Sequence, residues 1–251
     1  FQALFANTTA SNNVAVGYDA LTSTSASNNT AVGTGAGALV TSATELTLLG
    51  YAAGDALTTG SYNTALGTYA LSGCIVGERN TAVGRSALSV NTASYNTAVG
   101  MFAGAFNTTG DSNSALGYQA LIDNTTGTHN AAFGRDSLAS NTNASINVAI
   151  GSNALNASTT ASNNTAVGYQ SLKVATAGNN TAIGKDAGLL LTSGADNTFL
   201  GTFAGESATT GASNTFVGRA SGNTITTGAK NTILGRYNGN QGGLDIRTSS
   251  N

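Results

Sequence analysis

The most regular feature of the chain is a five-residue block, written "NTAVG" at residues 96–100, that returns every 16 or 17 residues. In each block polar positions are followed by two apolar positions, and a glycine closes it. These anchor glycines are separated by ten intervals of 17 residues and three of 16. They are Gly17, Gly33, Gly50, Gly67, Gly84, Gly100, Gly117, Gly134, Gly151, Gly168, Gly184, Gly201, Gly218 and Gly235. A fixed period of this kind predicts a solenoid in which each repeat forms one coil.

An asparagine column stands four residues before the anchor in thirteen of the fourteen blocks, and Leu46 replaces it in the other. Its members are Asn13, Asn29, Asn63, Asn80, Asn96, Asn113, Asn130, Asn147, Asn164, Asn180, Asn197, Asn214 and Asn231. Stacked Asn side chains form hydrogen-bonded ladders in cross-β arrays. We therefore predict a structural Asn ladder along the solenoid.

The block also has the alternation of a short extended segment. Successive side chains of a strand point to opposite faces, so Asn96, Ala98 and Gly100 share one face and Thr97 and Val99 share the other. Either the Ala column or the Val/Leu/Ile column can face the coil interior, and the other column then needs cover. Because a 17-residue coil has little interior of its own, we expect neighbouring chains of a closed oligomer to supply that cover.

A second block, "xxAL" or "xxAG", follows each anchor directly. Ala stands three residues after the anchor in ten copies, and the next position is Leu in seven copies and Gly in seven. We expect this block to form a second short strand in each coil. The spacers, such as "TSTSAS", are rich in Thr, Ser and Asn and predict turns. The sequence thus predicts an all-β fold, a parallel β-roll or β-solenoid of about fourteen short coils.

The repeat also predicts the domain boundaries. The opening "FQAL" aligns with "YQAL" at 118–121, so the first residues lie inside a repeat. At the other end, "NGNQGGLDIRTSSN" no longer follows the pattern. We predict a β-roll repeat domain at 1–238 and a transition to a following segment at 239–251.

Composition narrows the classes of function. The 251 residues carry a net charge of −2, only 8% are charged, and 40% are hydrophobic at regular positions, which favours a folded chain. Near neutrality gives no electrostatic reason to expect nucleic acid as a partner. No apolar run reaches the about 18 residues that predict membrane insertion. The single cysteine, Cys74, is expected to be a small buried residue.

Residues for catalysis are scarce. The single histidine, His129, lies in a spacer, and the eleven acidic residues are scattered over the coils. Triads need a positioned base, and glycosidases need two facing carboxyl groups. We therefore expect no enzymatic activity, no cofactor and no metal site.

The position directly after the anchor varies between coils and carries Tyr or a basic residue in nine of them. These candidates for surface recognition are Tyr18, Tyr51, Arg85, Tyr118, Arg135, Tyr169, Lys185, Arg219 and Arg236. Tyr and Arg are favoured at recognition surfaces, so the column is a candidate contact for a host receptor such as a cell-surface glycan. The alternative is that long amphipathic side chains simply cover the outer corner of the roll.

The repeat Asn-Thr-Ala-Val-Gly-x-x-Ala, over residues 1 to about 238, resembles the head repeats of YadA-type trimeric autotransporter adhesins, which read Asn-Ser-Val-Ala-Ile-Gly-x-x-Ser. That resemblance implies a left-handed parallel β-roll and an intertwined or side-by-side homotrimer. The present repeat is longer, and its "NTAVGYQAL" variant is more similar to repeats in tail fibres of marine bacteriophages. Similar repeats occur in adhesins of predatory bacteria and in fibre-like proteins of large algal viruses.

Taken with the resemblance, the sequence predicts a structural and adhesive fibre segment. We expect an extracellular virion tail fibre that projects towards or binds a host-cell surface, with itself as partner in the homotrimer. One alternative is a cellular trimeric adhesin on a bacterial surface. A further alternative is an ice-binding solenoid, because the Thr column before the Ala column is a regular array.

Overall fold

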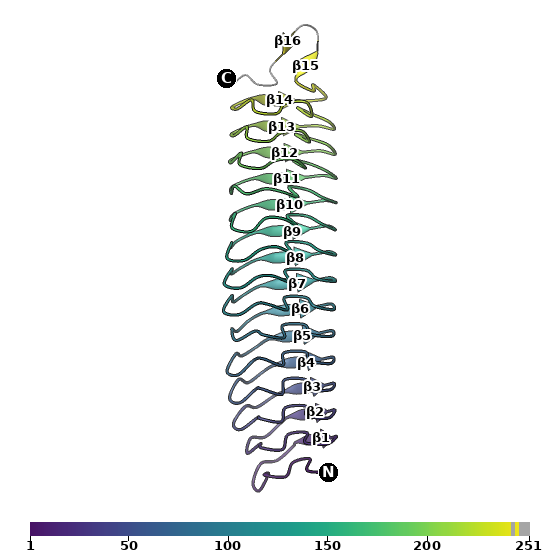
Figure 1. Cartoon of the computed structure of the whole chain (residues 1–251), viewed down its shortest axis with the longest axis vertical. Coiled ribbons are helices and arrows are strands. Elements are labelled where there is room, and N and C mark those ends of the chain that lie inside the picture. The colour runs from purple at the N-terminus through teal and green to yellow at the C-terminus, as the bar shows by residue number, and fades with distance from the viewer. Residues whose placement is uncertain (242–243, 246–251) are drawn as a thin grey trace. The chain divides into compact units, whose positions relative to one another are not determined.

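The computed structural model describes residues 1–241 and 244–245. Its described part is all-β, with one three-residue strand in each coil, which confirms the predicted β-solenoid (Figure 1). The strands are β1 (Val14–Val16), β2 (Thr30–Val32), β3 (Thr47–Leu49), β4 (Thr64–Leu66), β5 (Thr81–Val83), β6 (Thr97–Val99), β7 (Ser114–Leu116), β8 (Ala131–Phe133), β9 (Val148–Ile150), β10 (Thr165–Val167), β11 (Thr181–Ile183), β12 (Thr198–Leu200), β13 (Thr215–Val217) and β14 (Thr232–Leu234). An antiparallel pair, β15 (Asn240–Gln241) and β16 (Leu244–Asp245), comes after them. Most of the predicted transition at 239–251 lies outside the described residues.

The chain forms two compact units, Phe1–Thr128 with β1–β7 and His129–Asn251 with β8–β16. Within each unit the solenoid strands pair in parallel with their sequence neighbours and in register. Ala82 pairs with Ala98 in the first unit, and Ala166 pairs with Ala182 in the second. Because equivalent residues pair, each position of the repeat becomes a column of similar side chains.

The strands have one buried face and one outer face. The middle residue of the strand, such as Ala98, is fully buried. The residue before the anchor points outwards and stays accessible, with Val16 57% and Leu49 46% exposed. The Ala column therefore lines the coil interior and the Val/Leu/Ile column lies on the outer face, which settles the alternative that the sequence left open.

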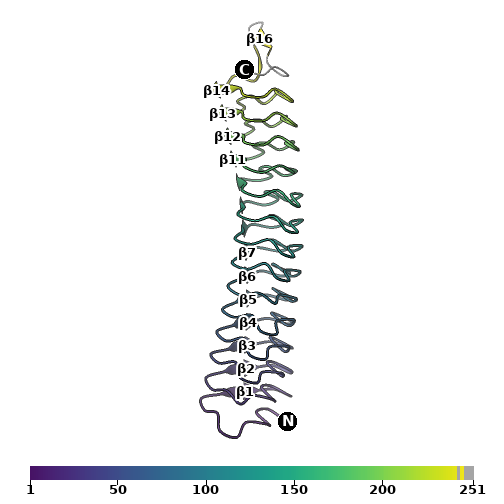
Figure 2. The same cartoon turned by 90° about the vertical axis from the view of Figure 1, so that its left-hand side faces the viewer.

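The prediction of a second strand in each coil is wrong. After the anchor the chain makes successive tight turns, in which Ala38 N–H donates to Gly35 O at 3.2 Å and Val40 N–H donates to Gly37 O at 3.1 Å. The residue four after the anchor is left-handed even where it is leucine, as at Leu71 with φ 54°. A strand needs φ near −120°, so this segment cannot be extended. Figure 2 shows the strands along one side of the coils and the turns on the other.

The coil interior is filled by two columns whose volumes compensate. Every coil with Leu four residues after the anchor has Ala in the middle of its strand, and every coil with a large middle residue has Gly there. The latter pairs are Leu48 with Gly54, Phe199 with Gly205, Phe216 with Gly222 and Ile233 with Gly239. A Cβ on Gly222 would lie 2.6 Å from the Phe216 ring. Close packing thus explains Gly54, Gly205 and Gly222, whereas Gly37, Gly104 and Gly188 accompany a middle Ala.

The anchor glycines let consecutive coils approach closely. At Gly67 the φ angle is 138°, and a Cβ there would lie 2.7 Å from the carbonyl carbon of Gly84. Both conditions exclude any other residue. Gly35, two residues after an anchor, differs, because its φ is 70° and the nearest atom to its Cβ position is 3.9 Å away.

The two glycines give a matched test of this constraint. Gly67→Ala should destabilise the chain by about 3 kcal/mol or more, because a strained backbone and an overpacked contact combine. Gly35→Ala should have a small effect, since Ala52 holds the equivalent position at φ 51°. Thermal unfolding followed by circular dichroism measures both, and equal melting temperatures for the two variants would contradict the close-approach argument.

Volume compensation predicts coupling between Phe216 and Gly222. Phe216→Ala should cost about 3–5 kcal/mol through the cavity, and Gly222→Leu should be destabilising through its clash with the ring. The double variant recreates the Ala–Leu pair of Ala166 and Leu172. It should therefore be more stable than the sum of the single changes by about 0.5–3 kcal/mol. Additive losses in a double-mutant cycle would show that the two columns do not share one space.

Candidate recognition surface

Within each unit, the Asn column joins neighbouring coils through its side chains. The Asn96 backbone N–H donates to Asn80 Oδ1 at 2.9 Å, and Asn96 Nδ2 donates to Gly110 O at 2.9 Å. The same two bonds recur along both units, as at Asn197 and Asn214. Each side-chain amide therefore satisfies one buried backbone N–H and one buried backbone C=O. Because both groups are buried, water cannot take the place of the amide.

Leu46 interrupts this ladder, and its neighbours compensate only for the lost contact with a carbonyl, because Leu46 offers no Oδ1 to the Asn63 backbone N–H. Leu46 N–H still donates to Asn29 Oδ1 at 3.0 Å. In the next coil Asn63 Nδ2 donates to Gly77 O at 2.7 Å and also to Gly60 O at 3.0 Å. Gly60 O is the carbonyl that an Asn at position 46 would reach, so the substitution leaves that acceptor satisfied.

A second amide ladder lies seven residues after the anchor, and the sequence analysis missed it. Asn107 Nδ2 donates to Asn91 Oδ1 at 2.6 Å, and Asn124 Nδ2 donates to Asn107 Oδ1 at 2.5 Å. All three side chains are buried. The available signal was Asn at one offset in consecutive coils, but other coils have apolar residues in this column, such as Leu57. Both ladders are structural features of the coil interior.

Cys74 occupies the same column and is fully buried, as predicted for a small buried residue. Burial raises the pKa of its thiol from an ordinary value of 9.0 to about 11, against a smaller opposing effect of a hydrogen bond to the Gly77 backbone. The thiol is therefore an uncharged core group at neutral pH.

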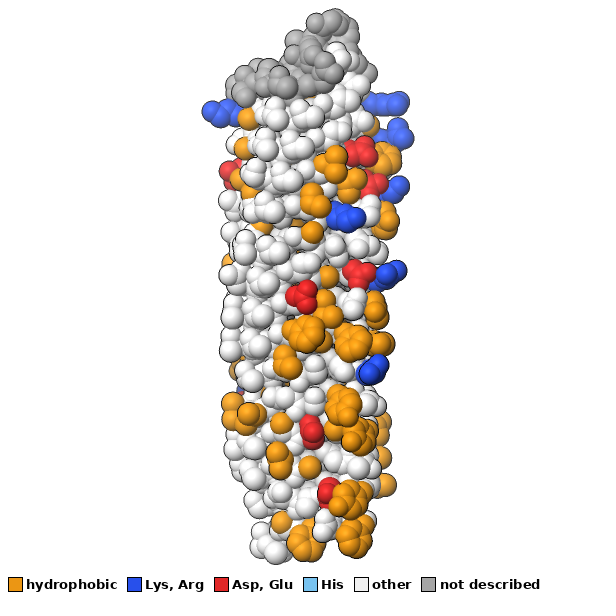
Figure 3. Space-filling model, viewed as in Figure 1, with side chains coloured by type: hydrophobic (Ala, Val, Ile, Leu, Met, Phe, Trp, Pro, Cys, Tyr) orange, Lys and Arg blue, Asp and Glu red, His pale blue; other side chains and the backbone are white. Residues whose placement is uncertain are grey.

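The nine recognition candidates all lie exposed on the outer surface of their own units. The first unit contributes Tyr18, Tyr51, Arg85 and Tyr118, and the second contributes Arg135, Tyr169, Lys185, Arg219 and Arg236. Figure 3 shows hydrophobic and charged side chains standing out from a mostly uncharged polar surface. A recognition surface and a simple cover of the outer corner would both leave these side chains exposed. Only the contacts between the side chains can distinguish these two interpretations.

The structure pairs this column with the next position of the following coil, which the sequence analysis did not select. Tyr69 N–H donates to Tyr51 O, and Phe102 N–H donates to Arg85 O, each at 3.0 Å. As a result the Tyr51 and Tyr69 ring centroids lie 5.3 Å apart at 87°. Arg85 Cζ lies 5.5 Å from the centroid of Phe102. The two pairs come from four successive coils of the first unit, and the charge of Arg85 acts on the Tyr69 phenol.

In the second unit the same pairing joins Lys185 to Phe203, and Arg219 of the next coil also approaches the Phe203 ring. Lys185 Nζ lies 5.2 Å and Arg219 Cζ 5.9 Å from the ring centroid of Phe203. Lys185 Nζ also lies 3.4 Å from Asp186 Oδ2. The charge of Lys185 is therefore shared with a carboxylate of its own chain.

A third group, five residues before the anchor, was also missed. Arg79 lies between two tyrosines, with its Cζ 4.9 Å from the Tyr62 centroid and 5.7 Å from that of Tyr95. Arg79 Nη1 also lies 3.0 Å from Glu78 Oε2. An aromatic, a cation and an aromatic at one offset in successive coils was the signal. Because Arg79 already contacts two aromatic rings and a carboxylate, we interpret it as a residue that stabilises the surface of these coils.

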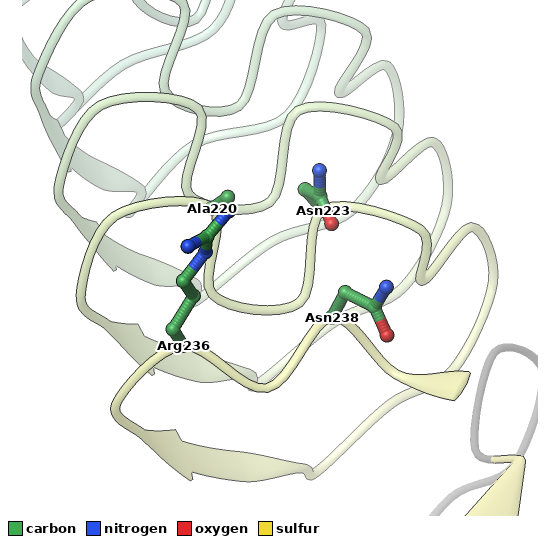
Figure 4. Close-up of a pocket in the computed structure, with 4 residues that line it drawn as sticks. All are labelled: Ala220, Asn223, Arg236 and Asn238. Carbon is green, nitrogen blue, oxygen red and sulfur yellow. The ribbon is translucent and has the colours of Figure 1, made fainter. Parts of the chain in front are cut away.

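Metal-ligating side chains do not gather in the described structure. No cluster of three His, Cys, Asp or Glu side chains there could hold a metal ion. His129 is exposed in its spacer turn, as expected. A hollow of about 400 Å³ beside the last coil is lined by Ala220, Asn223, Arg236 and Asn238 (Figure 4). That lining offers a cation and amides but no general base or nucleophile.

Comparison of the chain with protein-family models, with curated proteins and with solved structures finds no match. Among the described residues no helix could cross a membrane.

The buried thiol predicts a pH dependence. Because the folded chain holds the Cys74 proton more tightly than the unfolded chain, this contribution to stability is complete below pH about 9 and is lost as the pH rises towards 11. Melting temperatures of the wild type and Cys74→Ala from pH 7 to 11 isolate the effect, since both share all tyrosines. The wild type should lose stability relative to the variant above pH 9, and a constant difference would contradict the burial argument.

Proposed function

We propose that the chain is a structural and adhesive segment of a virion tail fibre, which assembles as a homotrimer and presents its variable columns to a host-cell surface. The repeat's resemblance to tail-fibre and trimeric-adhesin repeats supports the fibre role. The solenoid supports it in a second way, because its coils bury regular columns and leave the outer positions free to vary.

The outer sheet face is the observation that carries the proposal of assembly. Each strand directs two side chains outwards, a mostly Thr column and the Val/Leu/Ile column, and neither contains a charged residue in any of the fourteen coils. In each unit the aliphatic column remains half-buried or exposed in the single chain. Soluble proteins rarely leave a continuous apolar strip uncovered, so such a strip marks an interface. Closed cyclic symmetry covers the strip on every chain equally.

Mass in solution tests the assembly. The chain of 24.7 kDa should sediment as a trimer, and Val99→Asp should shift it towards the monomer, because a charge would be buried in an apolar interface. Met101→Asp is the matched control, since Met101 is exposed and lies beyond the strand. A wild-type monomer, or a Val99→Asp trimer as stable as the control, would contradict the proposal.

Ice binding is a second candidate, favoured by the outward Thr column. Equivalent residues such as Thr30 and Thr47 pair in register, and both are exposed. Ice would require the face that a trimer covers, so the two functions exclude each other. Thermal hysteresis from a monomeric chain would support ice binding, and its absence in the wild type would remove that candidate.

A further inference from the structure

We infer that Tyr51, Tyr69, Arg85 and Phe102, here called the Tyr–Arg cluster, bind an acidic polysaccharide built from uronic acids. The inference rests on the proposed adhesive function and names the class of ligand for it. It depends on one chain and on one unit, whatever the state of assembly.

The two tyrosines supply a platform for sugar rings. Tyr51 is 52% and Tyr69 41% exposed, and their perpendicular rings present faces and edges to solvent together. A side-chain hydrogen bond with Tyr51 is the largest cause that raises the pKa of the Tyr69 hydroxyl, so the two phenol groups act on each other at the rim of the platform. The C–H face of a pyranose packs on an aromatic ring, and sugar hydroxyls bond to the phenol groups at its rim. The two tyrosines therefore offer a saccharide both a ring face for packing and phenol groups for hydrogen bonds.

Arg85 supplies the charge that selects an acidic sugar. Within the described part of the chain it forms no ion pair, in contrast to Arg79, which contacts Glu78. Its Cζ lies 5.5 Å from the Phe102 ring centroid, a cation–π contact, and a guanidinium can bond a carboxylate through two N–H donors. Asp55, whose charge also acts on Tyr69, is half-buried, so Arg85 provides the exposed charge of the cluster.

The spacing of the cluster suits a linear polymer. Its four residues come from four successive coils, which begin at Gly50, Gly67, Gly84 and Gly100. At about 4.8 Å for each coil, the cluster extends over about 14 Å, enough for several sugar units. A protein partner would anchor in a desolvated pocket, whereas these rings lie on an open surface with polar rims.

Isothermal titration with defined hexasaccharides tests the inference. The probes are oligogalacturonate and oligomannuronate, with neutral cellohexaose for comparison. The wild type should bind at least one acidic probe more tightly than cellohexaose, and added salt should weaken that binding. Tyr69→Ala and Arg85→Gln should each weaken it about tenfold or more. Arg79→Gln is the matched control and should leave it unchanged, with circular dichroism showing that every variant is folded.

Several results would overturn the inference. These are no binding of either acidic probe, equal binding of cellohexaose, or acidic binding that Tyr69→Ala and Arg85→Gln leave intact. Capture of a host protein that needs Tyr69, without sugar binding, would also overturn it. Because the cluster belongs to one chain, a monomer that binds the acidic probe would refute the trimer and keep this inference. A trimer that binds neither probe would refute the inference alone.

Discussion

The amide bridge from each buried asparagine to its neighbouring coils is the interaction on which the solenoid depends. An Asn such as Asn96 accepts a hydrogen bond from the backbone N–H of Asn113 through Oδ1 and donates a hydrogen bond from Nδ2 to Gly110 O. Buried backbone groups that lose their partners cost about 1–3 kcal/mol each, so the bridge tolerates no shift in register. Consecutive coils must then have nearly equal length, which is the origin of the 16- and 17-residue period.

Glycine anchors and left-handed turns follow from that register. At anchors such as Gly67 the backbone approaches itself so closely that only glycine fits, and the turns place thirty-five non-glycine residues of the described structure at positive φ. Each left-handed residue costs about 1–2 kcal/mol. Burial of the Leu side chains and the hydrogen bonds between coils offset this strain. Stability is therefore shared between nearest neighbours, as in other solenoids, and the outer columns can vary without loss of the fold.

The repeat allowed the columns to be predicted, but not the conformation of every segment. Period and alternation located the Asn column and the two faces of the strand. They did not reveal that Leu71 is left-handed, because a leucine in that conformation is rare and its side chain alone suits a strand equally well. The burial of Ala98 in the coil interior could not be predicted from the alternation alone. It depends on the cross-section of the coil, which is set by turns that the sequence pattern does not specify.

The sequence predicted recognition residues within a single column. It did not predict which residues of other columns lie beside them. Tyr51 and Arg85 were identified after their anchors, but Tyr69 and Phe102 lie one position further along and join them only through the lateral hydrogen bonds between coils. The stack around Arg79 differs, because its three residues share one column five residues before the anchor, so the period did contain a signal for it. Contacts between unlike columns depend on how far the backbone is displaced from coil to coil, and a linear period contains no such information.

Amide hydrogen exchange at residue resolution tests the central claim most directly. The Asn96 amide, bonded to Asn80 Oδ1, should exchange far more slowly than that of Met101, which donates no backbone hydrogen bond in the described structure. Asn80→Ala should accelerate exchange at Asn96 and leave Asn197 unchanged. Slow exchange should recur with the 16- and 17-residue period along the Asn column. The amide bridge as the basis of the fold would be contradicted if the Asn96 backbone amide exchanged as fast as that of Met101. An exchange rate at Asn96 that Asn80→Ala leaves unchanged would contradict it equally.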